Sequence, residues 1–138
     1  MLLHVRFSLI ILLASCAAPL QTLELENRTP RPIDAVYVYA PGGARGQPRA
    51  KLAPNEHTSV RVPQGRVEVY AVSAKYQLDE HTRDVPEASQ ELEIHGPAKV
   101  IFYDQEDKPA EVSRPDVFGV EFAPPHTEKH VPLDETPQ

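Results

Sequence analysis

The sequence predicts an all-β fold, an antiparallel sandwich of about seven strands. Short runs that alternate apolar and polar residues are separated by proline and glycine along most of the chain. Proline accounts for 15 of the 138 residues, about twice the usual ~5 %. No stretch keeps a helical period over three turns, and few runs are apolar on both faces, which favours antiparallel pairing.

The first two strands lie on either side of a proline-rich break. In the run 23–26 leucine alternates with glutamate, so this strand has one solvated face. The segment 27–32 (NRTPRP) ends it, because its prolines cannot donate to a β-ladder. The run 33–40 (IDAVYVYA) predicts a second strand, with Ala35, Tyr37 and Tyr39 on one face and Asp34, Val36 and Val38 on the other.

The stretch 52–74 (LAPNEHTSVRVPQGRVEVYAVSA) predicts a β-hairpin with charged residues on its outer face. Its arms alternate on both sides of the turn PQG. The pattern resembles the L-x-P-G … V-x-V-P-x-G-x-Y-x-V-x-A hairpin of carboxypeptidase regulatory-like and transthyretin-like modules. Asn55 stands in place of the first glycine and Val67 in place of the aromatic residue. The resemblance covers about a sixth of the chain. It implies an immunoglobulin-like or transthyretin-like sandwich and no functional site.

The second half of the chain predicts three further strands and one weak one. The segment 75–84 is expected to be a polar loop, and 91–94 alternates like a strand. The run 99–103 (KVIFY) is the most apolar and predicts a central strand. A weak strand is expected to begin at Val112, and 117–122 (VFGVEF) is expected to be the last.

The N-terminus predicts an export signal that ends at the sole cysteine, Cys16. Arg6 precedes a short apolar stretch, and small residues follow it, which is the layout of a secretory signal. The run LASC at 13–16 resembles the lipobox of bacterial lipoproteins. The resemblance implies that Cys16 receives a thioether-linked diacylglycerol, that residues 1–15 are removed, and that the new amino group is usually acylated. The alternatives are a non-lipoprotein signal cut after Ala17 or Ala18, and a cytosolic protein with an apolar start.

A lipidated Cys16 would determine where the protein is located in the cell and where its mature chain begins. Two or three acyl chains form a stable anchor, because each buried methylene contributes about 0.8 kcal/mol. Alanine at position 17, where aspartate usually retains Gram-negative lipoproteins in the inner membrane, favours an outer-membrane lipoprotein facing the periplasm or the cell surface. We expect a signal peptide at 1–15, a short tether at 16–22, a sandwich domain at 23–122 and a disordered tail at 123–138.

The sequence offers no pattern for catalysis, and we expect no enzyme, no cofactor and no metal site. A nucleophile elbow and a glycine-rich phosphate loop are both missing from it. His126 and His130 have the spacing of a helical metal pair, but neighbouring prolines disfavour a helix. The acidic turn 104–107 lacks the ligand pattern of an EF-hand. Asn27 begins a glycosylation-type triplet, which we interpret as a turn-forming asparagine.

Two features indicate a candidate interaction surface. Tyr37 and Tyr39 share a strand face, and tyrosine is enriched at interfaces, although ordinary half-buried strand residues would look the same. The loop 41–51, which carries Arg45 and Arg49, is the most basic segment of an acidic chain. It would suit lipid headgroups or an acidic partner, and a plain solvated loop is the alternative.

We therefore expect a non-enzymatic, lipid-anchored envelope protein with a structural or protein-interaction role. Its partners would be the membrane, through the lipid on Cys16, and another envelope protein. The general layout is similar to the outer-membrane lipoprotein of type VI secretion systems, so a subunit of a secretion or envelope complex is one alternative. A small-ligand or carbohydrate-binding module is another, disfavoured by the lack of tryptophan. The net charge of −6 argues against a nucleic-acid partner.

Overall fold

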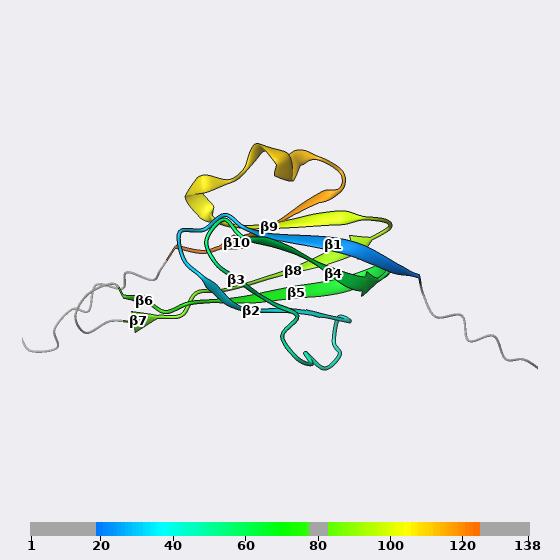
Figure 1. The fold of residues 1–138 in the computed structure, drawn as a ribbon, viewed down its shortest axis with the longest axis horizontal. Helices are drawn as coiled ribbons and strands as arrows, with labels where there is room; N and C mark the ends of the chain where they lie inside the picture. The colour runs from blue at the N-terminus through cyan, green and yellow to red at the C-terminus, as the bar shows by residue number, and fades with distance from the viewer. Residues whose placement is uncertain (1–18, 78–82, 125–138) are drawn as a thin grey trace, which may run out of the picture.

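The structure is a computed structural model that describes residues 19–77 and 83–124. Within these residues, two four-stranded sheets pack face to face as a sandwich (Figure 1). The strand order is β10-β9-β1-β4 in the first sheet and β3-β2-β5-β8 in the second. The predicted all-β sandwich is confirmed.

The strands alternate with short loops, and two 3-10 turns lie near the C-terminus. The elements are β1 (Leu20–Asn27), β2 (Ile33–Tyr39), β3 (Ala50–Leu52), β4 (His57–Pro63), β5 (Gly65–Ser73), β6 (Tyr76–Gln77), β7 (Arg83–Asp84), β8 (Glu87–Ile94), β9 (Ala98–Asp104), η1 (Gln105–Asp107), η2 (Ala110–Ser113) and β10 (Val117–Phe122). β1 thus begins three residues before the predicted domain boundary at 23, whereas β10 ends at the predicted residue.

The core lies between the two sheets and is built from alternate positions of each strand, as period-2 side-chain geometry requires. Leucine, isoleucine and valine fill most of it, and Phe102 and Phe122 are its largest buried side chains. The predicted inward set of β5 is confirmed, because Val67, Val69 and Ala71 are buried while Glu68 lies on the outer face. The chain thus covers its core without tryptophan.

A β-bulge at the start of β2 changes one predicted face. The pairing of β2 with β5 shifts between Ile33 and Ala35. Both Ile33 and Val36 therefore point into the core, although strict alternation would separate them. Asp34 is exposed and does not share the buried face of Val36, contrary to the sequence prediction.

The predicted hairpin at 52–74 is wrong. β4 pairs with β1 in the first sheet, whereas β5 pairs with β2 and β8 in the second. The turn between them, with Gly65 at φ 114°, therefore crosses from one sheet to the other. Alternation and turn residues locate the ends of strands but do not state whether the two strands bond to each other or face each other across a core.

β9 is central in its sheet, as predicted, but it runs parallel to both of its neighbours, β1 and β10, whereas the second sheet is antiparallel. Parallel neighbours need a crossover connection. Here the segment 105–116, gold and orange in Figure 1, passes over the outer face of the first sheet. It buries Ile101 and Tyr103 on that side of β9. The predicted weak strand at Val112 is wrong, because Val112 belongs to η2 in this covering segment.

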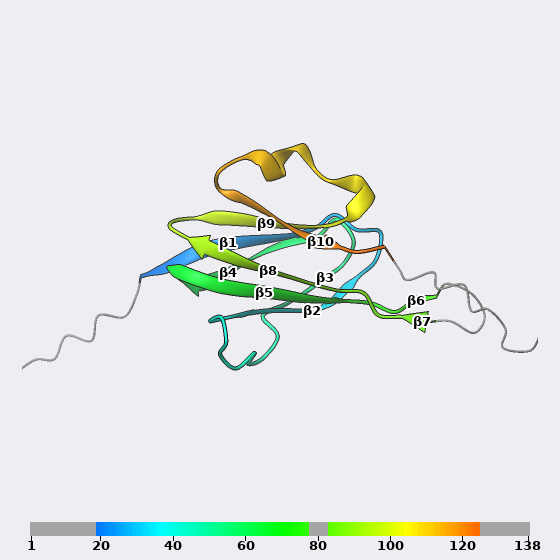
Figure 2. The same ribbon diagram turned by 180° about the vertical axis from the view of Figure 1, so that it is seen from behind.

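The sides of the sandwich are closed by neighbouring edge strands of opposite sheets. β10 lies against β8 on one side, as Figure 2 shows, and β3 lies beside β4 on the other. The segment 75–84, predicted to be a polar loop, contains the short pair β6 and β7, which prolongs β5 and β8. Cys16 and most of the predicted tail, 125–138, lie outside the described residues.

Candidate functional site

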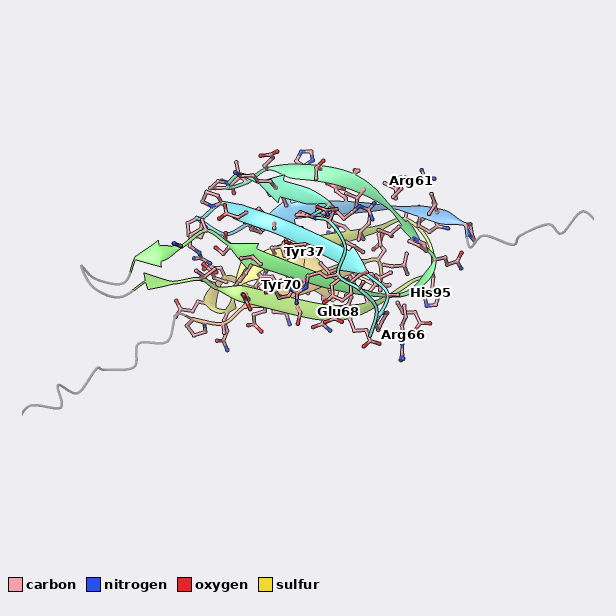
Figure 3. The ribbon with its side chains drawn as sticks, turned by 90° about the horizontal axis from the view of Figure 1, so that it is seen from below. Tyr37, Arg61, Arg66, Glu68, Tyr70 and His95 are labelled. Carbon is pink, nitrogen blue, oxygen red and sulfur yellow. The ribbon has the colours of Figure 1, made fainter. Side chains whose placement is uncertain are left out.

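A pair of tyrosines lies on the outer face of the second sheet. Tyr37 of β2 stands directly opposite Tyr70 of β5 in the antiparallel register. Their ring centroids are 5.9 Å apart with an interplanar angle of 44°. Cross-strand aromatic pairs of this kind stabilise a sheet by packing. Both side chains are half-buried, and Figure 3 shows them at the centre of this face.

The loop 40–49 returns over this face and brings Arg45 onto the tyrosines. Gly42 and Gly46 have φ values of 75° and 70°, a region in which glycine is favoured. The guanidinium carbon of Arg45 lies 3.9 Å from the ring centroid of Tyr70 and 5.6 Å from that of Tyr37. A guanidinium group in this position is attracted electrostatically to the face of the aromatic ring, which is a cation–π interaction.

The local electrostatics keep Tyr70 neutral at physiological pH. Burial raises the pKa of Tyr70, and a hydrogen bond with Glu87 and the charge of that carboxylate act in the same direction. Arg45 acts in the opposite direction but does not reverse the shift. Desolvation works to lower the pKa of Arg45, but a hydrogen bond with Tyr39 and the nearby tyrosines outweigh it, so that pKa is raised. Arg45 is therefore a permanent cation beside the neutral ring of Tyr70.

A cavity of about 470 Å³ opens next to this cluster, where β2 runs into the loop. Val38 and Val67 contribute apolar surface to it. Three guanidinium groups line it, and none of its lining residues is a carboxylate. These residues, Arg45, Arg49 and Arg66, are called the arginine cradle below.

The partners of the cradle differ in charge. Arg49 donates from Nη2 to the backbone carbonyl of Arg61 at 2.7 Å, which links the loop to the edge of β4. Arg66 forms an ion pair with Glu91, with 3.0 Å between Nε and Oε1, on a largely exposed surface. Arg61 in turn donates to the carbonyl of Leu20 at 3.3 Å, where β1 begins. Two of the three cradle arginines, Arg45 and Arg49, thus contact groups other than carboxylates.

The structure brings together the two separate features that the sequence indicated. Tyr39, Arg45 and Arg49 line the same cavity, and Arg45 covers Tyr37. Sequence reasoning did not include Tyr70 or Arg66 in this surface. Neither can be placed there without knowing that β5 pairs with β2, because the same alternation predicts a hairpin with β4.

Asn27 is a structural residue and is not available for modification in the folded domain. Its side chain is fully buried, and its amide nitrogen donates to the carbonyls of Arg31, Leu52 and Ala53 at 2.8, 3.3 and 3.2 Å. Its amide oxygen accepts hydrogen bonds from the backbone N–H and the hydroxyl of Thr29. This geometry supports the interpretation of the triplet as a turn.

Metal-ligating groups do not gather in the part of the chain that the structure describes: no cluster of three histidine, cysteine or acidic side chains that could hold a metal ion occurs there. His57 lies 3.7 Å from the Glu24 carboxylate on an exposed surface. His126 and His130 lie outside the described residues.

No model of a known protein family, no curated protein and no solved structure matches this chain. Over residues 19–77 and 83–124, no helix is long and apolar enough to span a membrane.

Proposed function

We propose that this chain is a non-enzymatic, lipid-anchored protein of the cell envelope that binds another envelope protein. The observation that carries the proposal is the short distance in sequence between the lipobox-like cysteine and the folded domain. The carbonyl of Pro19 already accepts a hydrogen bond from the backbone N–H of Gln64 at 3.1 Å. Two residues therefore separate Cys16 from the first residue bonded to the sandwich.

With a lipid on Cys16, this spacing would hold the domain against the membrane. Three extended residues span about 10 Å at most, so a lipid on Cys16 leaves little room for a stalk. The end of the sandwich where β1 begins, here called the tethered end, would face the bilayer. The outer face of the second sheet would stand upright beside it, accessible to another protein.

The surface that we assign to the partner is the tyrosine face, defined by Tyr37, Tyr70 and Arg45. Tyrosine and arginine are among the residues most enriched at the centres of interfaces, because they combine apolar area with a polar tip. Glu68 and Glu87 border this face and supply a polar rim. The loop 40–49 covers only part of this surface through Arg45, whereas the segment 105–116 passes over the outer face of the first sheet (Figures 1 and 3).

A small-ligand module is the second candidate, and the arginine-lined cavity favours it. Its volume of about 470 Å³ falls within the range of about 300–1,000 Å³ that is typical of ligand sites. A ligand of this site would be anionic, since the lining contains three arginines and no carboxylate.

The anchor is tested by replacing its attachment atom. We expect Cys16→Ala to abolish fatty-acid labelling and to release the chain from membranes that are washed with concentrated salt, which also weakens electrostatic contacts with headgroups. Ser15→Ala, which keeps a small residue before the cysteine, is the matched control and should be labelled like the wild type. A Cys16→Ala protein that still carries the fatty-acid label would refute the proposed lipidation.

The membrane assignment has its own test. Ala17→Asp introduces the usual inner-membrane retention signal of Gram-negative lipoproteins directly after the cysteine. In a Gram-negative host, density-gradient separation should then find the wild type in the outer membrane and the variant in the inner membrane. Recovery of the wild type in the inner membrane would contradict an outer-membrane address.

The partner surface is tested by photocrosslinking in intact cells. A photoreactive residue at position 68, beside the tyrosines, should capture a protein reproducibly. The same residue at position 113, in the segment that covers the other sheet, should not. Binding of a small anion, with no protein captured from position 68, would favour the ligand module instead.

A further inference from the structure

We infer that the arginine cradle is a phospholipid-docking site that binds the phosphate of an anionic headgroup and seats the tethered end on the bilayer. The inference rests on the proposed function for one point only, the lipid at Cys16 that would hold this end near the membrane. The site itself is argued from the charges and positions of the described residues.

The positive charge of the cradle is poorly compensated. Arg45 stacks on two tyrosine rings, and Arg49 donates to a backbone carbonyl. In the described residues, neither of them has a carboxylate partner. Arg66 pairs with Glu91, but the two side chains are 70 % and 49 % exposed, so water weakens this pair. An incoming phosphate can therefore meet three guanidinium groups without first displacing a buried carboxylate.

The cradle also differs in charge from the other cavities of this acidic chain. One cavity at the opposite end is lined by Asp104, Glu106 and Asp107 together with Arg31. A cavity near β9 contains Asp116 and a glutamate. In another, Asp116 and a glutamate are balanced by Lys99 and Arg114. None of these three linings carries a net positive charge, in contrast to the cradle. The net charge of −6 is thus unevenly distributed, and the cradle is a local site of attraction for anions.

The cradle lies where the chain enters the sandwich. Pro63 lines its cavity and is the register partner of Leu20, the first residue of β1. Figure 3 shows Arg61 and Arg66 at the same end of the molecule as the start of β1. Leu20 is 53 % exposed and is the more exposed of the two large apolar side chains on the surface of the described residues. An apolar side chain next to several arginines is typical of surfaces that sit at the headgroup boundary.

The chemistry of the cavity fits a phosphodiester that is attached to an apolar body. Guanidinium groups bind phosphate oxygens through paired N–H donors. Val38, Ala44 and Pro63 present apolar surface beside these donors. A membrane within about 10 Å of Pro19 would supply such headgroups at high local concentration, which a soluble anion lacks.

The test uses the full chain carrying Cys16→Ala, so that no acyl chain contributes to binding. Co-sedimentation is measured with vesicles of phosphatidylcholine alone and of phosphatidylcholine mixed with phosphatidylglycerol. We expect binding to the phosphatidylglycerol vesicles that weakens as salt is added. In Arg45→Ala/Arg66→Ala this binding should fall by roughly 25-fold, about fivefold for each arginine.

A matched variant removes two charges elsewhere. Lys75→Ala/Lys108→Ala changes the net charge equally, at residues far from the tethered end, and should bind like the parent chain. Arg45→Lys/Arg66→Lys should recover part of the lost binding, because charge returns without the paired donors. Residues 1–15 are present in every variant, so their own contribution to vesicle binding is the same in each. It therefore does not change the ratio of binding constants between a variant and the parent chain.

The outcomes separate this inference from the anchor. Equal loss of binding in the Lys75→Ala/Lys108→Ala and Arg45→Ala/Arg66→Ala variants would overturn it, because the effect would then be one of net charge. Saturable binding of glycerol phosphate in the cradle, without binding to phosphatidylglycerol vesicles, would also overturn it in favour of a soluble anion. If the native chain proved unlipidated at Cys16 while the Cys16→Ala chain still bound phosphatidylglycerol vesicles through the cradle, the proposed anchor would be refuted. The inference about the cradle would stand.

Discussion

Arg31 and Asp104 join the two sheets through a two-point ion pair. The guanidinium nitrogens of Arg31 lie 3.0 and 2.6 Å from the two carboxylate oxygens of Asp104. Arg31 also donates from Nε to the hydroxyl of Ser73 at 3.1 Å. Asp104 ends β9 in the first sheet, whereas Ser73 ends β5 in the second. One side chain thus links the two sheets at the end of the sandwich opposite the start of β1.

Asp104→Asn should destabilise the domain by about 1–3 kcal/mol. The substitution keeps the shape of the side chain but removes its charge and one of the two acceptors of a largely shielded guanidinium. Glu91→Gln is the control, because its pair with Arg66 is exposed and should contribute less than about 0.5 kcal/mol. Urea unfolding at neutral pH measures both. Equal effects would mean that the Arg31 pair is no stronger than a surface pair.

Asn27→Asp should destabilise the domain by about 3 kcal/mol or more. Three backbone carbonyls accept from the amide nitrogen of Asn27, and a carboxylate oxygen in its place would face them without a proton. Lowering the pH should recover part of the stability, because a protonated carboxyl can donate again. Asn27→Ala is the comparison and should show no such pH dependence. Stability is measured by urea unfolding at pH 7 and pH 4.

The sequence predicted the strands well because each one has an inner and an outer face. The runs at 33–40, 91–94, 99–103 and 117–122 all correspond to strands, and the apolar run of β9 correctly indicated a central position. Apolar and polar residues alternate along a strand that is buried on one face, and every strand of a sandwich has one such buried face. The inward set of β5 therefore follows from its alternating residues alone.

Pairing was less predictable, because it depends on contacts between distant residues. The turn at 63–65 looks like a hairpin turn in sequence, yet it connects opposite sheets. Val112 alternates like a strand residue but lies in η2, where it covers β9 and β10. The candidate site was only partly predictable for the same reason. The sequence indicated Tyr37 and Arg45 as candidate residues. Tyr70 and Arg66 can be added to the site only once the pairing of β2 with β5 is known.

Gly119→Ala should destabilise the domain by about 1–2 kcal/mol. A Cβ at this position would lie 2.7 Å from Cε1 of Tyr103 and 2.8 Å from Cγ1 of Val112, so the covering segment would have to move. Gly96→Ala is the matched control, since nothing lies within 4 Å of its added Cβ. Thermal unfolding compares the two. A melting temperature that is unchanged in both variants would show that the covering segment packs loosely on β10.

Glu26→Gln should remove part of the acid sensitivity of folding. Burial works to raise the pKa of Glu26, but hydrogen bonds from Lys99 and Arg28, each within 3.0 Å, and the charges of both residues outweigh it. The folded-state pKa is therefore below the ordinary value of 4.5. The stabilisation is present in full above pH 4.5 and is lost as the pH falls through the lowered pKa.

The wild type should consequently be about 1 kcal/mol more stable than Glu26→Gln at pH 7, and this difference should vanish near pH 2. Urea unfolding at the two pH values measures it. Glu93→Gln is the control, since its side chain is exposed and has no ion pair within the described part of the chain, and it should change the stability by less than about 0.5 kcal/mol. If the stability difference of Glu26→Gln persisted at pH 2, the side chain would be stabilising the sheet by packing, and its charge would not be the cause.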